Sequence, residues 1–487
     1  MNQLVPFGPG AKVFIGIYLL SLFVIGAFGY RARKKHSMRD FYLAGNGIGF
    51  VVLLLTLYST QYSGNTMLGF SGKAYRIGLS WVTCVHFMTA IVVVYLTFAP
   101  QLFRLAKQRD YITPTDFLAD RFGHTPLNVL ATCIMVIAIS NYLLAQLMAM
   151  GSVLEGLAPE DADTKRQAYY IGVGVLALII VIYESLGGFR AVVWTDVIQG
   201  SVLVVGFFVL LMVVLNHFGG LGDAVQTLMD SSEHRHKVAV PNGAWQREWI
   251  SYILMVGIGG ALYPQSIQRL YAAESASALR RSLMVMAFFP LTTALIAVIV
   301  GVIAAANIEG LEGDSVLFVV CREIQQESFF GYCLVVVLFS GVLAAVMSTA
   351  DSVLLSISSM VTKDLYGRLI RTDASEKHLT KFGKAVSWVL MVVLVFFAIE
   401  LRGTTLVNLL DRKFDLLVQL GPAFLIGVHS KKIRGDAIFL GISVGVAIAL
   451  SLAFAVNSKP FDIHPGLYGL VANLSVVAFA SMGPKKA

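Results

Sequence analysis

Two adjacent hydroxyl residues, Ser348 and Thr349, lie in the middle of an apolar run and are suited to binding a cation. Hard cations such as sodium take oxygen ligands, and neutral oxygens avoid burying further charge. Two hydroxyls are too few, so freed backbone carbonyls must complete a shell of about five oxygens. Small residues also recur here at steps of three and four, which is one helix face and equally fits a packing seam. They are Gly341, Ala345, Ser348, Ser352, Ser356 and Ser359.

Two other apolar segments are interrupted in ways that a simple membrane helix has no reason to be. The polar run 59–65, with sequence STQYSGN, interrupts one segment and offers Gln61, Ser63 and Asn65 as solute-binding side chains. Several glycines and Pro264 interrupt the other, and proline removes a backbone donor. Unwound backbone persists in a membrane where it lines a cavity or binds a ligand. The alternative is that glycine and serine merely allow close helix packing.

Asp196 is a third candidate, because a carboxylate within a membrane span is costly and often functional. It is therefore a candidate for a functional site. The alternative is an interfacial Asp196 that pairs with Arg190 or is reached by water. We expect Arg269 and Glu184, near helix ends, to extend towards the polar surface.

The composition points to a lipid bilayer as the solvent of this chain. Of its 487 residues, 57% are apolar and 14% are charged, against about 25% charged in soluble domains. The net charge is +8, which we attribute to basic cytoplasmic loops, since no soluble domain could present a nucleic-acid-binding patch. The four cysteines form no paired motif, so we expect neither a disulfide framework nor a metal site.

A membrane-spanning helix needs about 20 apolar residues, and the sequence predicts thirteen such helices. Their approximate ranges are 12–30, 47–70, 79–99, 126–157, 168–187, 190–217, 249–271, 281–306, 329–362, 381–400, 403–428, 435–456 and 462–482. An excess of Lys and Arg of about twofold on alternate loops predicts an outside N-terminus and an inside C-terminus.

The interrupted helices 47–70 and 249–271 are five helices apart and run in opposite directions. Interrupted helices at matching places in two halves indicate a transporter built from inverted repeats. We therefore expect residues 1–487 to form a single all-α integral membrane domain. Its first repeat would be 47–217 and its second 249–428, preceded by helix 12–30 and followed by trailing helices within 435–482.

Four stretches of this sequence resemble the sodium:solute symporter family. They are DFYLAGNGIG at 40–49, LGGFRAVVWTDVIQG at 186–200, AAVMSTADSVLLSISSMVTKDLY at 344–366 and RGDAIFLGISVGV at 434–446. The resemblance covers nearly the whole chain and implies the fold of the leucine transporter, with a 5+5 inverted repeat, one leading helix and two trailing helices. It also implies a sodium ion between helices 47–70 and 329–362.

Carried over from the family, the sodium ligands are two hydroxyls and three backbone carbonyls. The hydroxyls belong to Ser348 and Thr349, and the carbonyls to Ser59, Tyr62 and Ala345. Asp196 matches an aspartate of the family near a second sodium position, so the resemblance implies a role in binding a second cation or in coupling. Family members with a second sodium often have Ser at the position of Ala345, so we expect one sodium.

The resemblance leaves the solute less well defined than the ion. Ser63 matches a serine of the family, whereas Gln61 stands where proline carriers have an aspartate. The aromatic pair of the proline carriers would fall at Val256 and Gly260, and its absence counts against proline.

The segment DRKFD at 411–415 interrupts the predicted helix 403–428 and adds Arg412 and Lys413 to the candidate solute site. Arg412 and Asp415 are three apart and can pair on one helix face. We therefore expect a solute with a carboxylate, such as a monocarboxylate, a pantothenate-like acid or an amino acid. The alternative is that this segment is a wet outer mouth, with Lys413 extending into water.

The function that these features predict is sodium-coupled import of a small organic solute by alternating access in the cell membrane. Its partners would be the solute, sodium and the lipid bilayer, with no nucleic acid, and a monomer is the expected unit. An alternative is a transporter-like sensor that signals through a partner protein. An enzyme is not expected, because His86 is isolated and no HExxH, GxSxG or P-loop pattern occurs.

Overall fold

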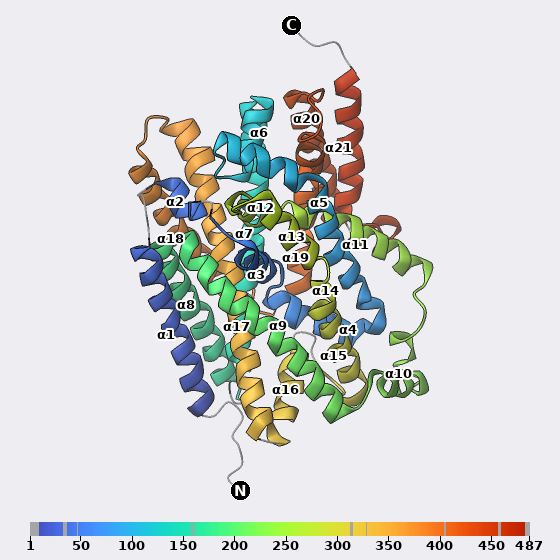
Figure 1. Cartoon of the computed structure of the whole chain (residues 1–487). Coiled ribbons are helices and arrows are strands. Elements are labelled where there is room, and N and C mark those ends of the chain that lie inside the picture. Colours follow the sequence, from blue (N-terminus) through green and yellow to red (C-terminus); the bar gives the residue numbers. More distant parts are fainter. Residues whose placement is uncertain are drawn as a thin grey trace.

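The computed structural model is a bundle of helices (Figure 1). It describes residues 9–32, 37–45, 47–156, 158, 161–311, 315–327, 329–403, 406–455 and 459–482, without the side chains of 9–12, 65, 67, 326–327 and 406–411. Within these residues no β-strand forms, and a single parallel bridge joins Ile48 to Ala273.

The first half of the chain forms helices over the first six predicted segments and further short helices between and after them. Their bounds are α1 (Pro9–Arg31), α2 (Met38–Leu43), α3 (Phe50–Gln61), α4 (Gly64–Ile77), η1 (Gly78–Val82), α5 (Thr83–Arg109), α6 (Pro114–Phe122), α7 (Thr125–Gly156), α8 (Ala162–Gly187), α9 (Phe189–Phe218), α10 (Leu221–Asp230) and η2 (Arg235–Lys237).

The second half continues the bundle over the remaining seven segments. Its elements are α11 (Gly243–Ala261), α12 (Pro264–Ala272), α13 (Ala276–Met286), α14 (Phe289–Thr292), α15 (Ala294–Asn307), α16 (Val316–Glu327), α17 (Phe329–Met360), η4 (Val361–Ile370), α18 (Glu376–Glu400), α19 (Leu406–Leu417), η5 (Val418–Leu420), η6 (Pro422–Ile426), α20 (Gly435–Ala453), η7 (Pro460–Asp462) and α21 (Pro465–Met482).

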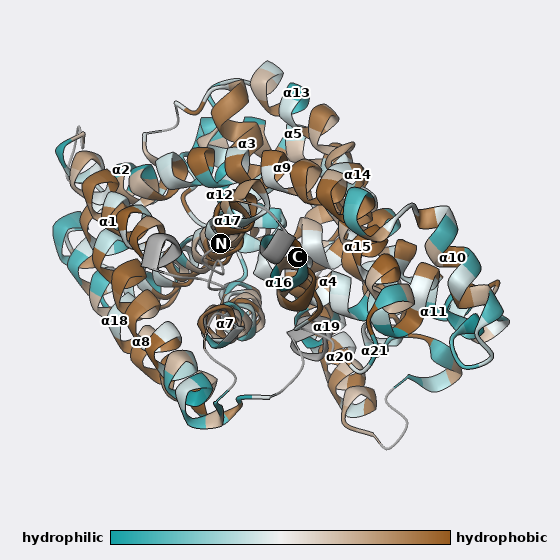
Figure 2. Cartoon of the chain, turned by 90° about the horizontal axis from the view of Figure 1, so that it is seen from below, coloured by the Kyte–Doolittle hydropathy of each residue, from teal (hydrophilic) through white to brown (hydrophobic). Residues whose placement is uncertain are grey.

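Ten described helices are long and apolar enough to cross a membrane, or eleven if the bent pair α11–α12 is one span. The number thirteen therefore stays a prediction, as do the repeats and the orientation. In Figure 1, α1 starts near the lower end of the bundle and α21 finishes at the upper end. The outer helices consist largely of hydrophobic residues (Figure 2), and Ile17 of α1 and Val392 of α18 are more than 60% exposed.

Both predicted interruptions are present as breaks between helices. Tyr62 and Ser63 have extended backbone between α3 and α4, and Thr66 and Ser63 form a capping box that starts α4. Between α11 and α12 the chain bends by 50°, and Pro264 occupies the first turn of α12, where it needs no donor.

The predicted helix 281–306 is wrong as a continuous element. The structure divides it into α13, α14 and α15, and Pro290 lies at the start of α14. Proline cannot donate the backbone hydrogen bond that a continuous helix would need at this position.

Helix α17 is the central element of the bundle. It packs against α3, α4, α7, α8 and α9, and its small residues allow close approach. A Cβ atom added at Gly64, the first residue of α4, would lie 1.9 Å from Cγ2 of Val346 on α17. Glycine is therefore required where the second half of the broken helix meets α17.

We expect Gly64→Ala to destabilise the protein by about 1–3 kcal/mol, because the stiff Val346 side chain cannot move aside. Val346→Ala should recover part of this loss in the double variant. Thermal unfolding of the purified protein measures both effects. Gly16→Ala is the control, since nothing lies within 4 Å of its added Cβ. Equal melting temperatures for Gly64→Ala and Gly16→Ala would contradict the close approach.

Candidate functional site: an ion-and-solute site between two broken helices

The break after α3 faces the hydroxyl pair of α17. The Thr349 hydroxyl donates to the Ser59 carbonyl at 3.4 Å, and both residues are fully buried. Two oxygens held at about 2.4 Å from one cation, at a right angle, lie about 3.4 Å apart. The donor chemistry and this spacing fit a sodium ion.

The remaining predicted sodium ligands belong to the end of α3 and to α17, the two helices that make this contact. Tyr62 caps α3, with its N–H donating to the Tyr58 carbonyl at 2.9 Å. Ala345 is buried one turn before Thr349 on α17. Ser348 is buried too, but its hydroxyl donates to the Asp196 carboxylate rather than pointing to Ser59.

Asp196 forms a fully buried ion pair that the sequence did not predict. Nη2 of Arg269 lies 2.7 Å from Oδ2 of Asp196, and the two side chains are 1% and 0% exposed. The expected extension of Arg269 and Glu184 to the polar surface is therefore wrong, since Glu184 is also 1% exposed. The alternative pairing of Asp196 with Arg190 is wrong too, because Arg190 binds Asp40 at 2.7 Å.

The Arg269 guanidinium connects four helices. Its Nε donates to Thr56 of α3 at 2.8 Å, its Nη2 to Ser352 of α17 at 2.5 Å and its Nη1 to the Gln265 carbonyl at 3.1 Å. Asp196 adds α9 and also accepts from Thr56. The network thus holds both broken helices against α9 and α17.

A second carboxylate, Asp351, lies beside this network and was also missed. It is fully buried and accepts hydrogen bonds from Tyr183 of α8 and from Ser352, the latter at 3.2 Å. Its position two residues after the hydroxyl pair was the signal that the sequence offered.

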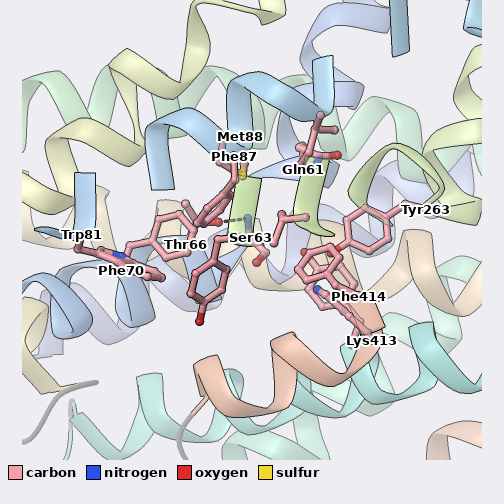
Figure 3. Close-up of a pocket in the computed structure, with 14 residues that line it drawn as sticks. Gln61, Ser63, Thr66, Phe70, Trp81, Phe87, Met88, Tyr263, Lys413 and Phe414 are labelled. Carbon is pink, nitrogen blue, oxygen red and sulfur yellow. Dashed lines mark hydrogen bonds between the residues drawn. The ribbon is translucent and has the colours of Figure 1, made fainter. Parts of the chain in front are cut away.

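A pocket opens next to the same break, on the side of α4, α11 and α19 (Figure 3). It encloses about 510 Å³ of empty space, including its open mouth. Seven of its fourteen lining residues are aromatic. The lining comprises Gln61, Ser63, Thr66, Phe70, Trp81, Phe87, Met88, Ile91, Tyr142, Tyr252, Val256, Tyr263, Lys413 and Phe414.

Four of the predicted solute-site residues line this pocket, namely Gln61, Ser63, Val256 and Lys413. Gly260 does not line it, but its carbonyl accepts from Tyr95 at 3.3 Å. A Cβ at Gly260 would lie 2.6 Å from Ile91, so an aromatic side chain does not fit there without a shift. The Asn65 side chain lies outside the described residues.

Arg412 and Lys413 are adjacent in sequence but occupy different environments. The Arg412 side chain is 42% exposed, lies outside the pocket lining and pairs with Asp415 at 3.8 Å, as the spacing predicted. Lys413 is 2% exposed, and its ammonium lies 3.2 Å from the ring centre of Tyr142. The expectation that Lys413 extends into water is therefore wrong.

Comparison with known proteins agrees with this architecture. The model of the sodium:solute symporter family matches residues 41–445. The chain belongs to the sodium:solute symporter family. Members of this family are multi-pass membrane transporters, so the chain is a sodium-coupled solute symporter and not an enzyme, and the sensor alternative is not favoured.

Two curated relatives are similar to this symporter over nearly their full lengths. The osmoregulated proline transporter OpuE of Bacillus subtilis is 26% identical, covering 97% of this chain and 95% of the relative. A sodium/pantothenate symporter of Haemophilus influenzae is 26% identical, covering 94% of each.

A solved structure supports the fold. It is the substrate-bound outward-open state of a Na⁺-coupled sialic acid symporter, which matches with a TM-score of 0.79 at 18% identity. The match covers 98% of this symporter and 97% of that chain. The resemblance to the leucine-transporter class of folds that the sequence indicated is thus confirmed at the level of the fold.

We expect Arg269→Gln to destabilise the symporter by about 3–5 kcal/mol, because it leaves the Asp196 carboxylate buried without its cation. Asp196→Asn should also be destabilising, since it strands the guanidinium. The double variant should be more stable than the sum of the two losses predicts. Thermal unfolding measures this cycle, and strictly additive losses would contradict a direct pair.

Proposed function

We propose that this symporter uses one sodium ion to import a small organic solute that carries a carboxylate. The observation that supports the solute class is the Lys413 ammonium in a pocket beside the break between α3 and α4. The described side chains that line this pocket include one formal positive charge and no carboxylate. An anionic group is therefore the complement of the lining.

The proposed sodium ligands are the hydroxyls of Ser348 and Thr349 and the carbonyls of Ser59, Tyr62 and Ala345. The 3.4 Å contact between Thr349 and Ser59 supports this set. To bind sodium, the Ser348 hydroxyl must point its proton away from the ion. The hydrogen bond from Ser348 to Asp196 already directs this proton to the carboxylate, so it favours sodium binding.

One sodium is proposed because Asp196 is already satisfied within the protein. Its carboxylate accepts from Arg269, Thr56 and Ser348, and Ala345 has no hydroxyl to offer a second ion. Asp196 then acts in coupling by holding Ser348 in place, rather than as a ligand of a second sodium.

Ion and solute would share the same broken helix. Ser59 belongs to the end of α3, whereas Gln61 and Ser63 line the pocket only two and four residues later. The start of α4 also presents backbone N–H groups, and the positive end of a helix favours an anion. Binding of sodium thus orders the backbone that the carboxylate contacts, which couples the two.

Transport would follow alternating access between two inverted repeats, 47–217 and 249–428, each of which contains one of the two breaks. Arg269 of the second repeat binds Thr56 of the first, so the network bridges both proposed repeats.

The test of sodium coupling is uptake of labelled carboxylates into proteoliposomes. One sodium ion that moves together with one monocarboxylate carries no net charge, so the sodium concentration gradient, and not the membrane potential, has to drive this uptake. Thr349→Ala should raise the sodium concentration for half-maximal uptake several-fold, because one ligand is lost. Ser340→Ala is the control, since its hydroxyl bonds only its own helix, to Val336. Equal uptake in choline buffer would reject sodium coupling.

Lys413→Gln should raise the half-saturating solute concentration at least tenfold at saturating sodium, because the pocket loses its positive charge. Arg412→Gln should change it less than twofold, since Arg412 lies outside the lining. Initial uptake rates at varied solute concentrations give both values. Similar effects of the two variants would argue against a carboxylate contact at Lys413.

A further inference from the structure

The pocket has two chemically different ends, shown on opposite sides of Figure 3. At one end lies Lys413 with Tyr142, Tyr263 and Phe414. At the other end four aromatic rings meet, which we name the aromatic cluster. It consists of Phe70, Trp81, Phe87 and Tyr252.

At the first end, the tyrosine rings stabilise the buried ammonium of Lys413. Tyr142 and Tyr263 are stacked with ring centres 5.4 Å apart, and the ammonium lies 3.2 and 4.9 Å from them. A ring quadrupole attracts a cation but does not cancel its charge. The Lys413 end therefore presents an ammonium group, in the pocket lining, to an anionic group of the solute.

The aromatic cluster offers a wall of rings in mutual contact. Trp81 lies edge-on to Phe70 at 5.6 Å and to Tyr252 at 5.8 Å, and Phe87 lies 5.8 Å from Tyr252. Aromatic pairs in such arrangements attract a further ring through dispersion and edge-to-face contacts. The cluster is thus suited to a flat apolar group.

Aromatic rings also bind quaternary ammonium groups. The charge around the aromatic cluster therefore decides whether it suits a flat apolar group or a quaternary ammonium group. Two cations already face its rings: the Lys73 ammonium lies 5.2 Å from the Trp81 ring, and the Lys459 ammonium lies 5.2 Å from the Tyr252 ring. The His464 ring packs 4.1 Å from the Tyr252 ring. Lys459 is paired with Glu248 at 2.6 Å, yet its ammonium and that of Lys73 already lie over these rings, so a cationic group of the solute would have to compete with them for the ring faces.

We propose that the solute is a monocarboxylate whose far end is an uncharged, ring-sized apolar group held by the aromatic cluster. This rests on the proposed function, because it assigns the carboxylate to Lys413. It adds that Phe70, Trp81, Phe87 and Tyr252 set specificity, by favouring the apolar end over a short chain, a second carboxylate or a trimethylammonium group.

Calorimetric titration of the purified symporter in saturating sodium chloride tests this with four probes: 3-phenylpropionate, propionate, succinate and glycine betaine. We expect 3-phenylpropionate to bind at least tenfold more tightly than each of the others. Propionate bound as tightly as 3-phenylpropionate would overturn the inference, and so would tighter binding of succinate or betaine.

Variants locate the selectivity within the pocket. Phe87→Ala should narrow the affinity gap between 3-phenylpropionate and propionate at least fivefold, and Phe87→Leu, which keeps most of the volume, at least twofold. Phe318→Ala should keep the gap, because this buried ring stacks on Phe339 away from the pocket. A gap unchanged in both Phe87 variants, with normal thermal unfolding, would contradict the assignment.

Uptake separates this inference from the proposed function. Sodium-driven uptake of propionate with no preference for 3-phenylpropionate would contradict the role of the aromatic cluster but leave the proposed function in place. Tight binding of 3-phenylpropionate without sodium-dependent uptake of any carboxylate would remove the proposed function and leave the binding assignment.

Discussion

Backbone groups freed inside a membrane must find partners within the protein, because lipid tails offer none. The breaks at Tyr62–Ser63 and at Leu262–Tyr263 therefore require the side chains around them to be polar and closely placed. The Ser63–Thr66 capping box satisfies one break. At the other, the Tyr263 carbonyl accepts from Ile267 and that of Gln265 from Arg269. Because these hydrogen bonds satisfy backbone groups at both breaks, each break is a stable part of the fold.

The same constraint links the buried ion pair to the proposed ion site. Arg269 bonds to Gln265, three residues after the second break, and to Thr56, which precedes the first. Asp196, held by Arg269, orients the hydroxyl of Ser348 beside Thr349. A change of backbone conformation at either break would therefore change the orientation of the hydroxyl pair. This gives a physical route for coupling between ion and solute.

Sequence alone predicted the broken helices, because polar runs and prolines in apolar segments are local signals. The resemblance to the family implied that Ser59 and Thr349 lie near each other, and the structure has them in contact. Sequence alone failed where the outcome depends on which residues meet across the bundle. Arg269 was placed at a helix end, since nothing local shows that Asp196 lies opposite it.

Lys413 and its neighbour Arg412 illustrate the same limit. Their separation into a buried and an exposed side chain follows from the rotation of α19 against α7 and α11. The aromatic cluster was missed because its rings come from α4, η1, α5 and α11 and share no sequence motif.

The central claim is that sodium and the carboxylate share the break between α3 and α4. Equilibrium binding of 3-phenylpropionate, measured without sodium and at saturating sodium, tests it most directly. By linkage, each ligand must raise the affinity of the other by the same factor. The account predicts an affinity at least tenfold higher with sodium and an equal gain in ²²Na binding when the acid is present. Equal affinities in sodium and in choline would contradict it.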